Sequence, residues 1–238
     1  MRTNNDRQRG KPWRILDTNE LLESNLRYGK NGKSRNYDIP IVKPIKWDEP
    51  FFIPIPPYTL GVLLGGGCII QGSMSFTTED TEIVEAVQRE MGDKYRIVLF
   101  NQNNYRVSYC RNKNNPLIEY LRELGLLGKY SYEKFMPDIY LRADIETRLN
   151  LLRGLMDTDG YIGTTSEFYT TSDRLSDNVL FLIRSLGGIP THKRKRTHYK
   201  KNGKRIECKK INIITFSLKT YNPFKLKSIF LHKRETTF

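Results

Sequence analysis

An internal repeat limits the possible folds of this 238-residue chain more than any other feature of the sequence. Residues 56–69 are matched by residues 149–162, at a spacing of 93 positions. The same spacing carries residues 76–80 onto residues 169–173. A unit that occurs twice in one chain predicts a molecule with two related halves and a pseudo-twofold axis between them.

Each copy opens with an apolar segment that contains glycine, Leu60–Gly67 in the first copy and Leu152–Gly160 in the second. Apolar residues surround the glycine on all sides, as on a helix buried against another helix, and glycine permits two backbones to approach closely. An amphipathic helix is predicted next in each copy, over residues 81–91 and 176–186. The two opening helices are therefore predicted to pack together at the pseudo-twofold axis.

Two strands are predicted after each amphipathic helix. In the first copy they are Tyr95–Phe100 and Tyr105–Arg111, and in the second copy Asn202-Gly203 separates two strand-like runs, which is a strong hairpin signal. Closing helices are predicted over Pro116–Leu127 and Pro223–Leu231. The sequence thus predicts an α+β fold of two αββαββα repeats with antiparallel sheets.

These elements predict three regions along the chain. Residues 1–57 form a basic N-terminal extension and a connector that is rich in proline from Ile39 onward. Residues 58–148 form the first repeat and residues 149–238 the second. The extension could contact DNA or be a remnant without a function of its own.

Positive charge is concentrated near the C-terminal end. The formal net charge is +14, and the stretch from Gly188 to Phe238 holds fifteen Lys or Arg residues against Glu207 and Glu235. A basic two-stranded ribbon fits the major groove of DNA, whereas a solvated charged edge that deters aggregation is the alternative. We favour DNA contact because ten of the 20 residues from Thr191 to Lys210 are basic.

Other protein classes are excluded by composition. Mean hydropathy is −0.58 and no apolar run approaches the about 18 residues of a membrane span. The polar first residues predict no secretory signal, and three scattered cysteines, Cys68, Cys110 and Cys208, suit a reducing compartment. We therefore expect a soluble, intracellular protein of the cytoplasm that acts on nucleoid or phage DNA. From its two ends, which lack the nucleophile and the Asn of protein splicing, we expect no splicing activity.

Two segments carry a family resemblance. Leu152–Gly160, with the sequence LRGLMDTDG, resembles the nine-residue LAGLIDADG motif, and Leu60–Gly67 resembles its first-copy form, in which Asp precedes the final Gly. The segment Lys134-Phe135-Met136-Pro137 ahead of the second motif is also similar to the family. The chain is thus identified as a member of the LAGLIDADG homing endonucleases, of the two-repeat monomeric type. It is most similar to intein-borne endonuclease domains, because Trp13–Leu21 resembles the connection from a splicing domain.

The resemblance implies a monomer that binds a long pseudo-palindromic site in double-stranded DNA between two sheets that form a saddle. It also implies Mg²⁺-dependent phosphodiester hydrolysis, with Mn²⁺ as a possible substitute. By this match Asp159 binds the metal, and Lys134 stabilises phosphate or assists proton transfer. The alternative for Lys134 is a solvent-exposed lysine ahead of a proline turn. The matching lysine of the second copy lies near Lys227 or Lys233.

One position departs from the family pattern. Gly66 stands where the first motif has its acidic residue, so that one of two expected metal carboxylates is missing. Loss of an anion weakens a divalent-cation site, and we expect cleavage to be impaired or restricted to one strand. The alternative is a non-cleaving, sequence-specific DNA- or RNA-binding protein of the same fold, such as a repressor or a splicing helper.

The side chains predicted to contact DNA come from the strands of both sheets and from the basic hairpin, with faces assigned by the alternation of side chains along a strand. They are Gln71, Ser73, Ser75, Arg96, Arg106, Thr164 and Ser166 on the sheets, and Lys193, Arg194, Lys195, Arg196, Lys200, Lys201, Lys204, Arg205 and Lys209 on the hairpin.

Overall fold

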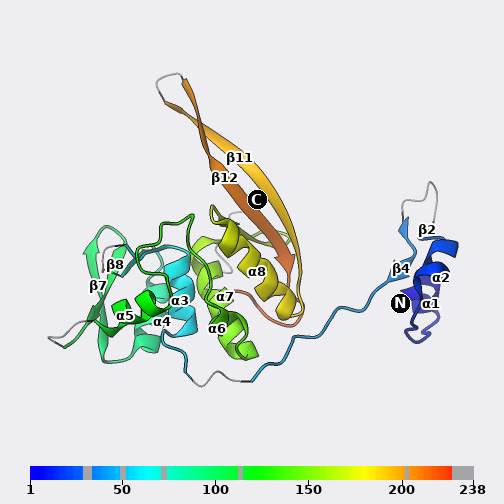
Figure 1. Cartoon of the computed structure of the whole chain (residues 1–238), viewed down its shortest axis with the longest axis horizontal. Coiled ribbons are helices and arrows are strands. Elements are labelled where there is room, and N and C mark those ends of the chain that lie inside the picture. The colour runs from blue at the N-terminus through cyan, green and yellow to red at the C-terminus, as the bar shows by residue number, and fades with distance from the viewer. Residues whose placement is uncertain (29–33, 49–51, 71–73, 112–114, 202–203, 227–238) are drawn as a thin grey trace. The chain divides into compact units, whose positions relative to one another are not determined.

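The computed structural model describes residues 1–28, 34–48, 52–70, 74–111, 115–201 and 204–226 (Figure 1). The chain divides into two compact units, Met1–Val42 and Lys43–Phe238. The limits of the extension and of the two repeats, placed at residues 57 and 148 from the sequence, stay predictions.

The N-terminal unit is small and has no buried residue in its described part. Thr3 and Asp17 begin its two helices with capping boxes, in which the side chain of the cap accepts a hydrogen bond from the backbone three residues on. Local hydrogen bonds, rather than a core, therefore define this unit. Its elements are β1 (Arg2–Thr3), α1 (Asn4–Gln8), α2 (Thr18–Glu23), β2 (Arg27–Tyr28), β3 (Ser34–Arg35) and β4 (Tyr37–Asp38), with antiparallel pairs β1–β4 and β2–β3.

The first repeat follows the predicted order of elements. Helix α4 has the predicted bounds, and the antiparallel sheet has the strand order β5-β6-β8-β7. The repeat consists of α3 (Pro57–Leu64), β5 (Gly67–Cys68), β6 (Ser75–Thr77), α4 (Thr81–Met91), β7 (Tyr95–Asn101), β8 (Asn104–Tyr109) and α5 (Pro116–Glu123).

The second repeat has the same order and a much longer final hairpin, which extends away from its helices (Figure 1). Helix α8 begins three residues earlier than predicted, because Ser172 caps it. The predicted closing helix lies largely outside the described residues, and positions 223–226 are not helical. The elements are α6 (Asp138–Leu141), α7 (Ile145–Asp159), β9 (Gly160–Ile162), β10 (Ser166–Thr170), α8 (Asp173–Ser185), β11 (Ile189–Lys201) and β12 (Lys204–Ser217), with sheet order β11-β12-β10-β9.

The two motif helices, α3 and α7, pack against each other through glycine. A Cβ atom added to Gly61 would lie 2.9 Å from the Cα of Gly154, and one added to Gly154 would lie 2.9 Å from the Cα of Gly61. Gly61 also faces the carbonyl of Leu151, and Gly154 faces the carbonyl of Tyr58. Tyr58 is the equivalent of Leu151, 93 positions earlier in the chain. The predicted helix packing is confirmed, and the contacts have twofold symmetry.

The spacing of 93 does not hold beyond the motif helices. In the first sheet Gly67 pairs with Phe76, whereas in the second sheet Gly160 pairs with Phe168. The predicted match of Phe76 with Tyr169 is therefore wrong, because the connection from Gly160 to its partner Phe168 is one residue shorter than the connection from Gly67 to its partner Phe76. A shift of one residue moves a side chain to the other face of a sheet.

Hydrogen bonds ahead of the next helices support this correction. The hydroxyl of Thr78 accepts a hydrogen bond from the amide of Asp80, at 3.1 Å, just before α4. The hydroxyl of Thr170 accepts the same bond from the amide of Ser172, at 3.1 Å, just before α8. The two turns are equivalent at a spacing of 92, so the second repeat has lost one residue relative to the first.

The α+β fold class is confirmed by these two repeats. One continuous apolar core joins them, with Phe76 and Val107 buried beneath the helices in the first sheet and Phe168 and Ile214 in the second. The three cysteines are free thiols. Within the described residues, no helix is both long and apolar enough to cross a membrane.

Candidate functional site

Asp159, the last residue of α7, is exposed at the point where the two motif helices end. A Cβ atom added to Gly65, at the end of α3, would lie 3.6 Å from the carboxylate of Asp159. Both residues line a cavity of about 230 Å³, together with Ile211 of β12 and Thr170 of β10. The fold therefore brings the ends of both motifs to one opening beside the second sheet.

Gly66 occupies the position equivalent to Asp159. A Cβ on the following residue would collide with the preceding turn in both repeats, at 2.5 Å from the Cα of Leu63 for Gly67 and at 2.7 Å from that of Met156 for Gly160. The two glycines thus have the same surroundings, so the residue before each has the same place in its motif. The centre has a carboxylate at this position in the second motif and none in the first.

Lys134 is not the solvent-exposed lysine that was considered as an alternative. Its side chain is 3% exposed, and its ammonium group donates hydrogen bonds to the carbonyls at the end of α3. The acceptors are the carbonyl oxygens of Leu63 at 2.9 Å, Leu64 at 3.1 Å, Gly65 at 3.3 Å and Gly67 at 2.7 Å. A cation at this place satisfies backbone carbonyls that have no partner within the helix and complements the negative end of the helix dipole.

Burial lowers the pKa of the Lys134 ammonium to about 8, and the negative charge of Asp159 opposes this shift. The lysine is therefore still largely protonated near neutral pH. Because its hydrogen-bond donors are directed to the carbonyls, its charge acts on the cavity through space.

Asp157 has a different role from Asp159. It is buried and accepts a hydrogen bond of 2.9 Å from the hydroxyl of Tyr58, in the other motif helix. Burial and the charge of Asp157 raise the pKa of Tyr58, which keeps the hydroxyl protonated as a donor. This hydrogen bond links α3 to α7.

The donors at the cavity limit the metal that they can hold. No group of three or more His, Cys, Asp or Glu side chains comes together in the described part of the chain, which argues against an all-protein cage. Mg²⁺ is commonly held by one or two carboxylates together with water and substrate phosphate. The exposed carboxylate of Asp159 fits this second arrangement.

Three predicted DNA contacts of the first sheet share one face. Ser75 pairs with Arg106, and Arg96 pairs with Ser108 on the same side, opposite the buried Val107. Arg96 and Arg106 are exposed, while Ser75 is buried. Gln71 and Ser73 lie outside the described residues.

The second sheet is different. Ser166 pairs with the buried Phe216 and is itself buried on the helix-covered side, and Thr164 is exposed in the turn before β10. Because of the one-residue shift, the position equivalent to Ser75 is Glu167 rather than Ser166, and Glu167 lies on the open face of the sheet. The structure therefore brings neither residue onto the open face of β10.

The basic run at the start of the hairpin is split between the two faces of the sheet. Lys193 pairs with Ile213 and Lys195 pairs with Ile211, the residue that lines the cavity, so both lysines lie on the cavity side. The two intervening arginines lie on the opposite side. Arg194 forms an ion pair with Asp173 at 3.1 Å, and Arg196 forms one with Glu207 at 3.6 Å.

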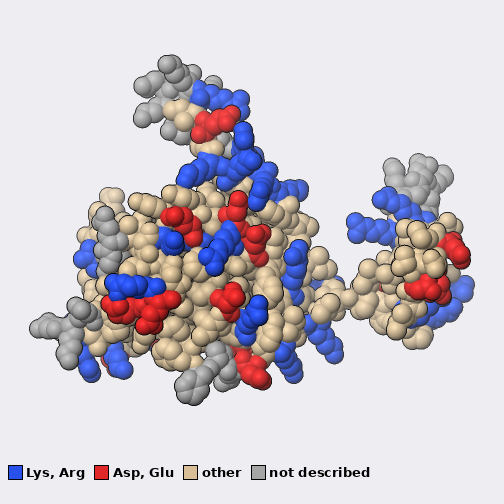
Figure 2. Space-filling view, viewed as in Figure 1, with Lys and Arg blue, Asp and Glu red and all other residues tan. Residues whose placement is uncertain are grey.

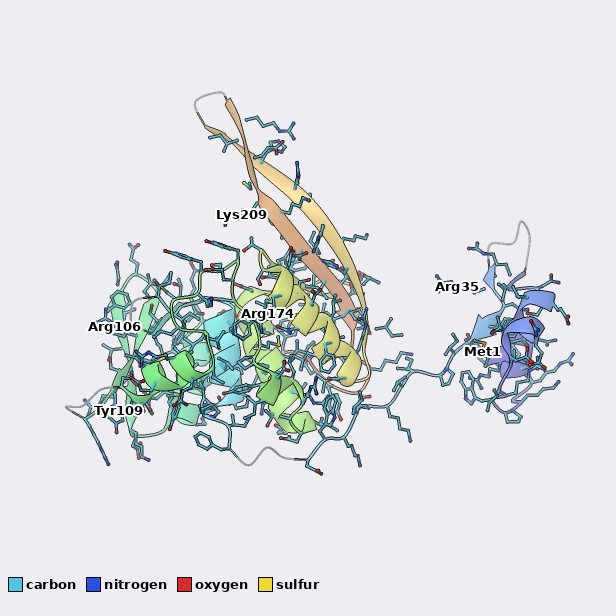
Figure 3. All side chains as sticks on the ribbon, in the orientation of Figure 1. Met1, Arg35, Arg106, Tyr109, Arg174 and Lys209 are labelled. Atoms are coloured by element: carbon cyan, nitrogen blue, oxygen red, sulfur yellow. The ribbon has the colours of Figure 1, made fainter. Side chains whose placement is uncertain are left out.

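The remaining basic residues continue along the hairpin, where Figure 2 shows the side chains of Lys and Arg gathered. Lys200 and Lys201 lie in β11, Lys204 and Arg205 lie in β12, and Arg205 is exposed. The predicted Asn202-Gly203 turn lies outside the described residues. Lys209, labelled in Figure 3, lies lower on β12, and its ammonium is 3.1 Å from the centre of the Tyr132 ring.

Tyr130 and Tyr132 were not predicted from the sequence to belong to this region. Their rings stack in parallel beside Ser131, which lines the cavity. The alternating Tyr-Ser-Tyr ahead of Lys134 was the available signal, and only the burial of Lys134 places it at the cavity.

Comparison with known proteins gives one family and several partial relatives. Residues 146–219 match the model of the LAGLIDADG-like domain. The replicative DNA helicase DnaB of Mycobacterium intracellulare is 34% identical over 56% of this chain and 19% of its own length. DnaB of Nostoc sp. is 30% identical, covering 54% and 17%, and the ATP-dependent DNA helicase Hel308 of Thermococcus kodakarensis is 31% identical, covering 50% and 11%. The match thus spans less than a fifth of the length of these relatives.

Among solved structures, the chain is similar to I-DmoI in complex with its target DNA in the presence of magnesium. The TM-score is 0.40 at 13% sequence identity, over 78% of this chain and 97% of the other. Residues 146–219 thus resemble a LAGLIDADG-like domain, and the predicted resemblance to the LAGLIDADG homing endonucleases is confirmed.

Proposed function

We propose that this chain binds double-stranded DNA at a specific site and hydrolyses phosphodiester bonds with Mg²⁺, as a homing endonuclease impaired by Gly66. The observation that carries the proposal is the exposed carboxylate of Asp159 at the joined ends of two LAGLIDADG-like helices. The cavity beside it opens on the sheet face that carries Lys193 and Lys195. DNA that lies along this face would pass beside the carboxylate, where a phosphate could share a metal ion with it.

In this proposal each charged group has a separate task. Asp159 would hold Mg²⁺, which supplies an activated water and stabilises charge on the phosphate. Lys134 holds the end of α3 in place and adds positive charge near the cavity without touching the phosphate. Lys193 and Lys195 orient the DNA backbone, because phosphate contacts fix register and carry no sequence information.

A single carboxylate favours cleavage of one strand or none. Double-strand cleavage needs two reacting phosphates, and the first motif offers only Gly66 at the equivalent position. The second candidate function, a non-cleaving DNA- or RNA-binding protein of the same fold, is favoured by this same glycine. We also propose that the chain is a monomer, since its two repeats already supply both halves of a pseudo-twofold reader.

The intein-like origin is part of the same proposal. Proteins with different names, a DnaB helicase, a Hel308 helicase and RecA, share a stretch of 119 to 148 residues with this chain while most of their length does not match. A stretch shared in this way behaves as a module that enters different hosts.

The test has two stages, because the target sequence is unknown. Bound duplexes are selected from a random library, and a supercoiled plasmid that carries the selected site is incubated with Mg²⁺, Mn²⁺ or a chelator. We expect selective binding and slow, metal-dependent nicking that Asp159→Asn removes and Asp177→Asn, the same change at an exposed position of α8, leaves intact. Selective binding without nicking in either metal would favour the non-cleaving alternative, and absence of selected sites would contradict both the endonuclease and a non-cleaving DNA-binding protein.

A further inference from the structure

Two exposed tyrosines form a flat aromatic surface beside the cavity. The rings of Tyr130 and Tyr132 are parallel within 2°, with centroids 5.8 Å apart, and the residues are 52% and 45% exposed. About half of the area of each tyrosine is therefore open to solvent and available to a ligand.

The turn that presents these rings is held rigidly. The amide of Glu133 donates a hydrogen bond of 2.8 Å to the carbonyl of Tyr130, and the carboxylate of Glu133 accepts one of 3.1 Å from the amide of Tyr130. The next residue, Lys134, is fixed at the end of α3, and its carbonyl accepts a bond of 2.6 Å from the hydroxyl of Ser172. The rings are therefore positioned in advance of any ligand.

The location of the pair connects the basic hairpin to the cavity. Ser131, between the two tyrosines, lines the cavity together with Asp159. From the other side, Lys209 places its ammonium over the ring of Tyr132. A strand whose phosphates follow the hairpin would bring its bases toward the tyrosines.

We propose that Tyr130 and Tyr132 bind an unpaired nucleobase of a DNA strand at the rim of the cavity. This inference rests on the proposed DNA-binding function and adds a ligand to it. Exposed aromatic rings next to a basic groove are the usual platform for bases of single strands, because every base has a flat face that can stack. The cavity behind the pair combines apolar walls, Leu64 and Ile211, with the hydroxyl groups of Thr170 and Thr171, which suits the edge of a base.

The test compares an oligothymidine of about 16 nucleotides with a duplex of the same length, both bound to the full chain. We expect the double variant Tyr130→Ala and Tyr132→Ala to weaken binding of oligothymidine by at least about tenfold and binding of duplex by less than about twofold. The double variant Tyr130→Phe and Tyr132→Phe keeps the rings and is expected to keep both affinities. Phe52→Ala is the matched control, since Phe52 is 54% exposed and packs against another ring, that of Tyr120.

Three results with the variants would overturn the inference. These are an unchanged affinity of the alanine variant for oligothymidine, an equal loss for strand and duplex, and a loss in the phenylalanine variant as large as in the alanine variant. A wild-type chain that binds duplex and not oligothymidine also overturns it and leaves the proposed function standing. A chain that binds neither overturns both.

Discussion

The final hairpin has seven and six residues per strand in the first repeat, β7 and β8, and 13 and 14 in the second, β11 and β12. The acidic end of the motif shows the same inequality, with Gly66 in one repeat and Asp159 in the other. The contacts between Gly61 and Gly154, by contrast, are the same from both sides. Symmetry is thus kept where the two halves pack and is lost where DNA and metal would bind.

The largest expected effect is on chemistry at the second motif. We expect Asp159→Asn to abolish nicking, because it removes the carboxylate that would hold Mg²⁺ with the phosphate, and to change DNA affinity by no more than a few-fold. Plasmid nicking and duplex binding on the same preparation measure both quantities. Cutting at an unchanged rate would show that the metal is held elsewhere.

A single added methyl group is expected to disrupt the symmetric interface between α3 and α7. Gly154→Ala places a methyl group 2.8 Å from the backbone nitrogen of Val62 and 2.9 Å from the Cα of Gly61. Since backbone must move to admit it, we expect a loss of about 3 kcal/mol or more in the free energy of unfolding. Asn150→Ala, on the outer side of the same helix, is the control for thermal melting. Equal melting of the two variants would contradict the close packing.

The inequality of the motifs can be reduced by Gly66→Asp. We expect Mg²⁺-dependent double-strand cleavage to rise, because the substitution restores the second carboxylate. The new Cβ would lie 3.1 Å from the carbonyl oxygen of Thr77, so a small backbone shift and a modest loss of stability accompany it. Gly66→Asn adds a side chain of the same size without the charge and should not raise double-strand cleavage above that of the wild type. A folded, DNA-binding Gly66→Asp protein that leaves the target uncut would show that position 66 is assigned wrongly.

The smallest effect is electrostatic. The charge of Asp159 raises the pKa of Lys134 and so opposes the lowering by burial. Asp159→Asn removes that charge, and we expect the pKa of Lys134 to fall below about 8. An NMR titration of the lysine side chain measures this value. An unchanged or higher pKa would mean that the carboxylate does not act on the ammonium.

Periodicity and glycine spacing were sufficient to predict the two repeats, the helix packing through Gly61 and Gly154, and the basic hairpin. They failed at Tyr169, because a constant spacing of 93 does not allow for a connection between paired strands that is one residue shorter in the second repeat. The burial of Lys134 could not be predicted from the sequence either, since a lysine is usually exposed and its hydrogen-bond acceptors come from residues about 70 positions away. For the same reason, the tyrosines that this lysine holds at the cavity were missed.

The central claim, that the hairpin of the second repeat contacts DNA with the face it shares with the cavity, has a direct test. Lys193 and Lys195 lie on that face, whereas Arg194 and Arg196 lie on the other, in ion pairs with Asp173 and Glu207. The measurement is the salt dependence of duplex affinity for two double variants, with each pair changed to glutamine. We expect the lysine pair to flatten the slope of log K against log salt by roughly 0.9 per charge, with melting unchanged, and the arginine pair to flatten it less. A slope unchanged in both variants, or a larger change in the arginine pair, would contradict the account.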